Sequence, residues 1–236
     1  MIRLYLPYPL KQNEPIQLNN EQYHYLCHVM RLTPSDKFLC FNGTDGEWET
    51  QIEPSGKKQW HAIPKKQTRP QNSVPFCALC PALIKKDNFD LILQKATELN
   101  VSDIYPLKLA HSVVTSLNMN RAQTILKEAA EQSERLTLPT LHPVSSLKEF
   151  LQQIPKDVEL YYLSERDSTT VKPVSKEKAA FIIGPEGGFT KEELEILAKQ
   201  KNAQAIHFPE TILRAETAAI AAISCWQLGS FAPIKK

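Results

Sequence analysis

Two short stretches in the last third of the chain carry side chains that could do chemistry. Arg214 offers a guanidinium that stays charged and presents several donors in a fixed fork, which suits it to stabilise negative charge. Glu186 and Glu216 offer carboxylates, which can act as general bases. Side chains of these types could remove a proton and stabilise negative charge if the fold brings them together. Each glutamate also has a structural alternative, since Glu216 could simply occupy the favourable first turn of a helix.

The first stretch is a loop between an expected strand and an expected helix. The apolar run 179–183 is typical of a buried strand. Three of the chain's seven glycines follow it: Gly184, Gly187 and Gly188. Thr190 then predicts a helix N-cap, with Glu193 completing a capping box. Open α/β sheets use a strand, a loop and a helix start in this way to hold a ligand, although an ordinary strand-to-helix turn has the same pattern.

The second stretch lies at another expected strand-to-helix junction. Residues 203–208 predict a strand, Pro209 ends it, and 211–222 lead into a helix that has no interior glycine or proline. Arg214, Glu216 and Thr217 are therefore placed at a helix start. Neither loop contains G-x-G-x-x-G or a P-loop Lys-Ser or Lys-Thr, which excludes the usual phosphate-binding motifs.

The rest of the chain predicts two domains joined by a polar, proline-containing linker at 66–75. The first, residues 1–71, is expected to be β-rich, with strands at 2–6, 37–42 and 48–52 and a helix from Asn19 or Asn20 to Arg31. The second, residues 72–236, alternates strands and helices, which favours a parallel α/β sheet. We expect its other strands at 76–83, 103–107, near Leu141 and at 158–163, and its other helices at 87–100, 118–135 and 145–153.

Composition indicates a globular cytoplasmic protein, because no uncharged apolar run approaches the roughly 20 residues of a membrane span. Five cysteines are an odd number, and the close pair Cys77 and Cys80 has no second pair to complete a zinc site. His24 and His28 have metal-ligand spacing but lack an evident third ligand. We therefore expect reduced thiols and no metal.

The charge distribution indicates a nucleic-acid partner more clearly than the formal net charge of +2. Between Glu53 and Asp87 the charged residues are all basic: Lys57, Lys58, Lys65, Lys66, Arg69, Lys85 and Lys86. Trp60 and His61 lie within this block and add stacking surfaces, a mixture that suits unpaired RNA. A lysine-rich, solvated hairpin is the alternative.

The motifs GPEGGFTKEE and ILRAETAA, in this order, resemble the knotted SPOUT methyltransferases and, within them, the RsmE family, which methylates N3 of a uridine in small-subunit (16S) ribosomal RNA. The resemblance extends to LILQKATELNV at 91–101, to KEAAEQSER at 127–135 and to the N-terminal part. It implies an α/β fold in which a C-terminal SPOUT trefoil-knot domain follows a smaller, β-rich PUA-like domain. It also implies S-adenosylmethionine as methyl donor, an RNA substrate within the ribosomal subunit, and a homodimer formed through the apolar helix 215–228.

The same resemblance assigns residues to roles. The donor pocket would comprise Leu163, Gly184, Pro185, Glu186, Gly187, Gly188, Ile212, Leu213, Arg214, Thr217 and Ala218. The basic block supplies the RNA-binding candidates Lys57, Lys58, Lys65, Lys66 and Arg69, and the resemblance adds Arg31, Lys95 and Arg135, with Glu98, Glu131 and Gln132 also on the substrate side. Arg214 would stabilise the deprotonated uracil, and Glu186 and Glu216 are the candidate bases. The chain departs from the family pattern at Gln94, Asn100 and His111, where Glu, Gly and Arg are usual.

The sequence therefore predicts an S-adenosylmethionine-dependent methyltransferase that acts on N3 of a uridine in ribosomal RNA. Two alternatives remain open. One is ribose 2'-O methylation, because other SPOUT enzymes have a similar glycine loop. The other is an inactive RNA-binding factor in ribosome assembly.

Overall fold

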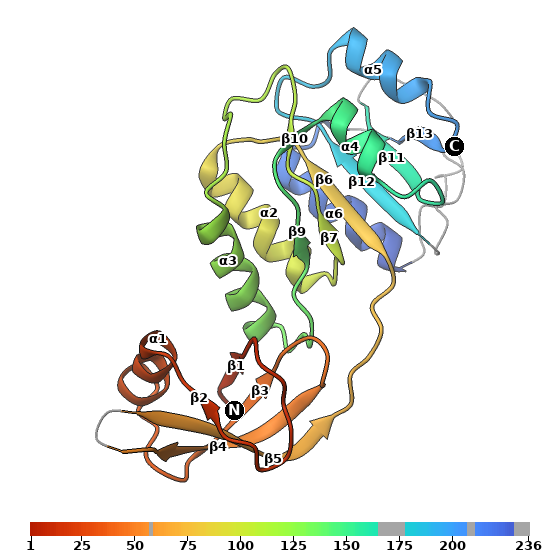
Figure 1. The fold of residues 1–236 in the computed structure, drawn as a ribbon. Coiled ribbons are helices and arrows are strands. Elements are labelled where there is room, and N and C mark those ends of the chain that lie inside the picture. Colours follow the sequence, from red (N-terminus) through yellow and green to blue (C-terminus); the bar gives the residue numbers. More distant parts are fainter. Residues whose placement is uncertain (57–58, 165–177, 207–210, 229–236) are drawn as a thin grey trace. The chain divides into compact units, whose positions relative to one another are not determined.

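The computed structural model describes residues 1–56, 59–164, 178–206 and 211–228, which form two compact units (Figure 1). Unit 1 consists of Met1–Ser73 together with Ala130–Leu138, and unit 2 consists of Val74–Ala129 together with Pro139–Lys236. A later segment thus packs with the N-terminal part of the chain. The domain boundary near residue 72 remains a prediction about the functional domains.

Unit 1 is built on a five-stranded sheet in the order β1-β3-β4-β5-β2. Its strands are β1 (Arg3–Tyr5), β2 (Ile16–Gln17), β3 (Lys37–Phe41), β4 (Glu47–Pro54) and β5 (Trp60–Arg69). The strands expected at 37–42 and 48–52 correspond to β3 and β4, which pair as an antiparallel hairpin with Phe41 opposite Glu47. The linker prediction was wrong at its start, because residues up to Arg69 belong to β5. Pairing of Arg69 with Glu47 on β4 overrides the polar, proline-containing sequence there.

One helical segment covers the core of unit 1. Helix α1 (Asn20–Tyr23) continues into the π-helical segment η1 (His24–Val29). Asn19 caps α1, and Gln22 bonds back to the Asn19 backbone, which completes a capping box. Leu26 is fully buried against the sheet. The helix ends before the predicted Arg31, because Arg31 has a left-handed backbone with φ of 59°.

Unit 2 is built on a parallel six-stranded sheet in the order β13-β11-β12-β6-β7-β9, as the strand–helix alternation predicted. Its strands are β6 (Cys77–Pro81), β7 (Asp103–Ile104), β9 (Thr140–Leu141), β11 (Glu159–Leu163), β12 (Ala179–Ile183) and β13 (Ala203–Ile206). The strand expected at 103–107 is interrupted, because Pro106 has no N–H to donate to a ladder. Its second part, β8 (Leu107–Lys108), pairs instead with β10 (Ser145–Ser146).

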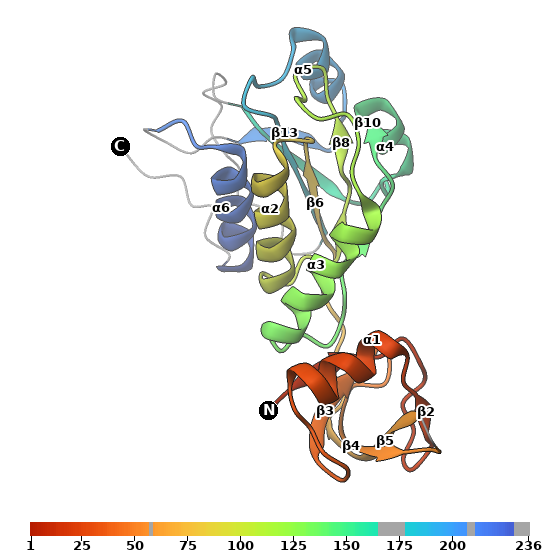
Figure 2. The same ribbon diagram turned by 90° about the vertical axis from the view of Figure 1, so that its left-hand side faces the viewer.

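Helices cover both faces of this sheet. On one face lie α2 (Lys86–Glu98), α3 (Met119–Gln132, whose last residues belong to unit 1) and α6 (Ala215–Leu228), with α2 and α6 side by side (Figure 2). On the other lie α4 (Leu147–Gln153) and α5 (Lys191–Ala198). Cys77 packs in the first core and Cys80 in the second, because residues i and i+3 along a strand point to opposite faces. Helices on both faces leave the ends of the strands as the place for a site.

Candidate active site

The residues predicted to act together leave three neighbouring strands at the same edge of the sheet. β11 lies between β12 and β13, with Tyr162 opposite Ile182 and Leu163 opposite Ile206. Because all three strands are parallel, Leu163, the glycine loop after Ile183 and the chain leading to α6 all start from the carboxyl ends. The structure thus brings together the ends of three strands that are separated in sequence, at Leu163, Ile183 and Ile206.

Each glycine of the loop has a different structural reason. Gly188 closes a turn by donating its N–H to the Pro185 carbonyl at 2.8 Å, and its φ of 68° is a conformation that favours glycine. At Gly184, an added Cβ would lie 3.1 Å from the Phe189 ring. At Gly187, it would lie 3.1 Å from His111 Cβ. The loop therefore owes its composition in part to packing inside the protein.

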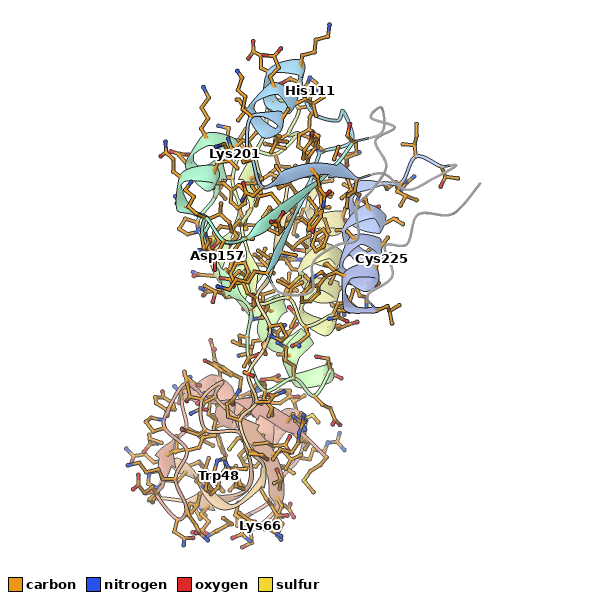
Figure 3. The ribbon with its side chains drawn as sticks, turned by 90° about the vertical axis from the view of Figure 1, so that its right-hand side faces the viewer. Trp48, Lys66, His111, Asp157, Lys201 and Cys225 are labelled. Carbon is orange, nitrogen blue, oxygen red and sulfur yellow. The ribbon has the colours of Figure 1, made fainter. Side chains whose placement is uncertain are left out.

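The loop is fastened to the segment that follows β8. His111 Nδ1 lies 3.0 Å from the Gly187 carbonyl oxygen and 3.1 Å from that of Gly188. Nearby, the Ala110 N–H donates to Glu193 Oε1 at 2.9 Å. In Figure 3, His111 lies close to α5, the helix to which Glu193 belongs. Sequence reasoning did not place His111 in the site; its only signal was a histidine where the resembled family usually has arginine.

The start of α5 agrees with the predicted capping box. The Thr190 side chain accepts the Glu193 N–H at 3.2 Å, and Glu193 Oε2 accepts the Thr190 N–H at 2.9 Å. Glu193 is buried, with 9% of its surface exposed. The Glu193 carboxylate therefore caps the start of its own helix and also binds the backbone of Ala110.

The two functional candidates at the entry to α6 differ in their exposure. Arg214 is exposed, and its backbone is held because its carbonyl accepts the Ala218 N–H at 2.8 Å. Glu216, two residues later, is only 8% exposed, and its Oε2 has no hydrogen-bond partner among the described residues. A buried carboxylate without a partner is costly, so it marks a place where a further group can supply a donor.

The other predicted donor-site residues divide by exposure. Pro185 and Ala218 are buried, and Leu163, Gly184, Gly188 and Leu213 are partly buried. Glu186, Gly187 and Thr217 are exposed. Ile212 is 78% exposed, which is unusual for a large apolar side chain.

The predicted RNA-binding residues of unit 1 differ in how available they are. Arg31 and Lys66 are exposed, and Figure 3 shows Lys66 at the periphery of the unit. Lys65 is partly buried and forms an ion pair with Glu53 at 3.6 Å. Lys57 and Lys58 lie outside the described residues. An RNA contact by any of them remains a prediction.

Two of the predicted RNA-binding arginines are engaged within unit 1. Arg69 donates to the Glu134 carbonyl at 3.0 Å and lies 3.8 Å from the buried Glu47 carboxylate. Arg135 is 9% exposed and donates to Thr137 Oγ1 at 3.0 Å. Arg69 thus ties segment 130–138 to β5, and Arg135 is bonded within that segment, structural roles that the sequence did not suggest. In unit 2, Lys95 pairs with Glu98 at 2.9 Å on α2.

An aromatic series in unit 1 uses Trp60 differently from the prediction. Trp60 packs against the core and is stacked by Tyr23, with ring centroids 5.2 Å apart. Tyr23 contacts the edge of His28 at 5.4 Å, and His28 lies 5.3 Å from His24. Both histidines are exposed. The two imidazoles are thus the most exposed rings of this series, and Tyr23 and Trp60 are partly buried.

The described residues contain no group of three or more His, Cys, Asp or Glu side chains that could hold a metal ion. All five cysteines are free. Burial raises the pKa of Cys40 to about 12 and that of Cys80 well above its usual value, so neither thiol is a ready nucleophile. In the part of the chain that the structure describes, no helix is long and apolar enough to cross a membrane.

Comparison with known proteins defines the class to which this fold and site belong. Residues 71–227 match the family described as RNA methyltransferase domain, and residues 18–65 match the RNA methyltransferase PUA domain. A putative methyltransferase from Legionella pneumophila, solved in complex with the bound cofactor SAM, has a TM-score of 0.87 at 28% identity, over 96% of this chain and 97% of that chain. The fold is that of a SPOUT-type RNA methyltransferase with a PUA-like N-terminal domain.

The particular family follows from relatives that match along nearly the whole chain. The ribosomal RNA small subunit methyltransferase E of Rickettsia conorii is 36% identical over 228 residues, 94% of this chain and 93% of that protein. The Neisseria gonorrhoeae protein of the same name, crystallised with S-adenosyl methionine, has a TM-score of 0.85 at 27% identity, with 97% of each chain covered. The chain belongs to the ribosomal RNA small subunit methyltransferase E family.

These comparisons confirm the predicted resemblance to RsmE and the predicted fold class, an α/β SPOUT domain with a smaller PUA-like β domain. The connections 165–177 and 207–210, on which the tracing of the trefoil knot depends, lie outside the described residues.

Proposed function

We propose that this protein transfers the methyl group of S-adenosylmethionine to N3 of a uridine in 16S ribosomal RNA. One observation carries the proposal. The glycine loop follows β12 and the chain that leads to α6 follows β13, on either side of β11, in a chain matched along nearly its whole length by ribosomal RNA small subunit methyltransferase E relatives. Two structures of similar chains were solved with that methyl donor bound.

The residues at the strand ends fit this methyl donor. A Cβ at Gly188 would have no atom within 4 Å, so the backbone there is open to a ligand. The unpartnered Glu216 Oε2 can accept a hydrogen bond from an ammonium or hydroxyl group. The residues that would hold the donor are those of the predicted pocket, from Leu163, the 184–188 loop and the 212–218 segment. The bound donor supplies an electrophilic methyl group.

Arg214 has the properties that stabilisation of a deprotonated uracil requires. Once N3 has lost its proton, the negative charge spreads onto the two carbonyl oxygens of the base. The Arg214 side chain is exposed, and no ion pair joins it to another described residue, so its donors can be directed to those oxygens. Its fixed backbone limits the reorganisation needed during the reaction.

The two candidate bases have different surroundings. Glu186 is exposed on the glycine loop, so its carboxylate can reach a proton on an incoming base. Glu216 is buried beneath the α6 entry. We therefore assign proton removal to Glu186 and a donor-holding role to Glu216.

RNA would be bound in part by unit 1. Arg31 and Lys66 are exposed and Lys65 is partly so, and cations of this kind bind phosphates. We include Lys57 and Lys58 among the proposed phosphate-binding residues because they lie in the same basic block of the sequence as Lys65. A substrate within the ribosomal subunit and a cytoplasmic location agree with this partner.

The proposal includes a homodimer through α6. Ala219 and Trp226 face the core, whereas Ile220, Ala221 and Cys225 are partly exposed on a helix that has little charge. Small side chains allow a second helix to approach closely. Light scattering should find a dimer at micromolar concentration, and a monomer throughout that range would contradict the assignment.

The decisive experiment incubates the protein with labelled donor and small ribosomal subunits from cells that lack it, and then separates the nucleosides by mass spectrometry. We expect N3-methyluridine in 16S RNA. A ribose-methylated product would overturn the assignment to N3. Donor binding or RNA binding without any product would instead favour a role in ribosome assembly. Naked 16S RNA, tested in parallel, decides whether the assembled subunit is needed.

A further inference from the structure

His111 links two loops that lie far apart in the sequence. Its Nδ1 is 3.0 Å from the Gly187 carbonyl oxygen and 3.1 Å from that of Gly188. Carbonyl oxygens only accept hydrogen bonds, so Nδ1 must carry a proton. The imidazole therefore donates directly into the backbone of the glycine loop.

The residue before His111 reinforces this link. The Ala110 N–H donates to Glu193 Oε1, while Glu193 Oε2 accepts the Thr190 N–H, each at 2.9 Å. Thr190 follows the loop and caps α5. Residues 110–111 thus hold the loop at its last two glycines and at the helix start that follows it.

Contact with His111 also explains the glycine at position 187. Gly187 does not have a left-handed φ, so residues other than glycine could adopt its backbone conformation. A Cβ there would instead lie 3.1 Å from His111 Cβ, 3.3 Å from Cγ and 3.4 Å from Nδ1. Gly187 and His111 therefore form one packed and hydrogen-bonded pair.

We propose that His111 is a positioning residue for the methyl donor, which acts by holding the Gly187 and Gly188 carbonyls in the loop conformation that binds it. This inference rests on the proposed function. Without the imidazole, the two carbonyl oxygens lose their hydrogen bond from Nδ1. The loop must then be ordered when the donor binds, and the entropy cost of that ordering lowers the affinity. Chemistry at the methyl group depends on other residues, so His111 affects donor binding more than the rate at saturation.

The test is a set of substitutions in the full-length protein, with S-adenosylmethionine affinity measured by calorimetry. His111→Ala should raise the Kd about 3- to 10-fold, the usual effect of removing one hydrogen bond. His111→Asn should restore most of the affinity, because its Nδ2 stands the same number of bonds from the backbone as Nδ1 of histidine. His111→Asp should bind less well than alanine, because it places a carboxylate against two carbonyl oxygens. At saturating donor, single-turnover rates of the alanine and asparagine variants should stay within about twofold of wild type, given that the hydrogen bond acts on binding.

A double-mutant cycle with Gly187→Ala tests the pair itself. Gly187→Ala should weaken donor binding in the wild-type background and weaken it less in the His111→Ala background, because two of the three close contacts are then absent. Glu193→Gln should also weaken donor binding, because it loses one of the two carboxylate oxygens that accept the Ala110 and Thr190 N–H groups. Its matched control is Glu195→Gln, which changes an exposed side chain on the same helix.

Three outcomes would overturn the proposal. They are an unchanged Kd in a folded His111→Ala protein, no advantage of asparagine over alanine, and additive effects in the cycle. If wild type binds no donor at all, the proposed function fails and this inference fails with it. If wild type binds and methylates normally while the His111 variants match it, this inference alone is wrong.

Discussion

The glycine loop follows β12 and the chain that leads to α6 follows β13, with β11 between the two strands, and the loop and the α6 entry are built in opposite ways. In the loop, the backbone at Gly187 and Gly188 is held by His111, and few side chains project. At the entry, Arg214 is exposed and Ile212 is 78% exposed. A fixed backbone is suited to binding, whereas a long exposed cation on a helix start is suited to acting on a substrate. The comparison predicts that changes at the loop glycines alter donor affinity and that changes at Arg214 alter the rate.

The largest expected effect is at Arg214. Arg214→Ala should lower the single-turnover rate on small subunits about 10²- to 10³-fold, since one donor to a developing anion is removed. Donor affinity should change little, and lysine should rescue only in part because it lacks the planar fork. The rate is measured at saturating donor and small subunit, with calorimetry for the donor. A normal rate would remove Arg214 from catalysis, and loss of donor binding alone would move it to the binding side of the comparison.

The loop should respond in the opposite manner. Gly187→Val should weaken donor binding roughly 5- to 100-fold, because extra methyl groups forced against His111 cost about 1–3 kcal/mol. The expected cause is a contact with His111 inside the protein rather than a clash with the ligand. Calorimetry gives the affinity, and circular dichroism checks the fold. Unchanged affinity in a folded variant would reject this loop as the donor site.

Elements with a strong local signal were predicted well from the sequence. The strand 179–183, the capping box from Thr190 to Glu193 and the hairpin after β3 were all confirmed, because each depends on neighbouring residues. The end of β5 was not, because its pairing with β4 is decided by tertiary structure. The His111 contact is beyond such reasoning, since its partners are backbone carbonyls 76 and 77 residues away, which leave no mark on sequence pattern.

The basic residues also show what sequence reasoning cannot predict. Charge alone could not separate Lys66, which is exposed, from Arg69 and Arg135, which have partners in unit 1. A cation in a basic stretch binds RNA only if the fold leaves it available. Availability is a property of the folded chain.

Charge reversal of the basic block should therefore affect RNA and leave both donor loops intact. Changing Lys57, Lys58, Lys65 and Lys66 to Glu should lower RNA affinity roughly tenfold and flatten its salt dependence by about 0.7 for each phosphate of single-stranded RNA that is no longer neutralised. Binding is measured over a series of salt concentrations. Reversal of Lys199 and Lys201, exposed lysines of unit 2 outside the proposed site, is the control. An equal salt slope in the two variants would reduce the block to a solubility feature.

The smallest effect is expected at Glu216, which is proposed to hold the donor, whereas Arg214 is proposed to act in catalysis. Glu216→Gln removes a buried charge whose Oε2 has no partner among the described residues, which should raise the stability of the free protein by about 1 kcal/mol. The loss of a favourable charge in the first turn of α6, typically about 0.3–1 kcal/mol, opposes this gain, so the melting temperature should rise by only about 1–3 °C. If the carboxylate accepts a hydrogen bond from the donor, donor affinity should fall about 2- to 5-fold, because the amide is a weaker acceptor. Thermal melts with and without donor measure both effects at once, and Glu195→Gln on α5 should show neither because that side chain is exposed. A lower melting temperature with unchanged donor affinity would make Glu216 a structural residue of α6 and leave the donor without an acidic partner at this helix start.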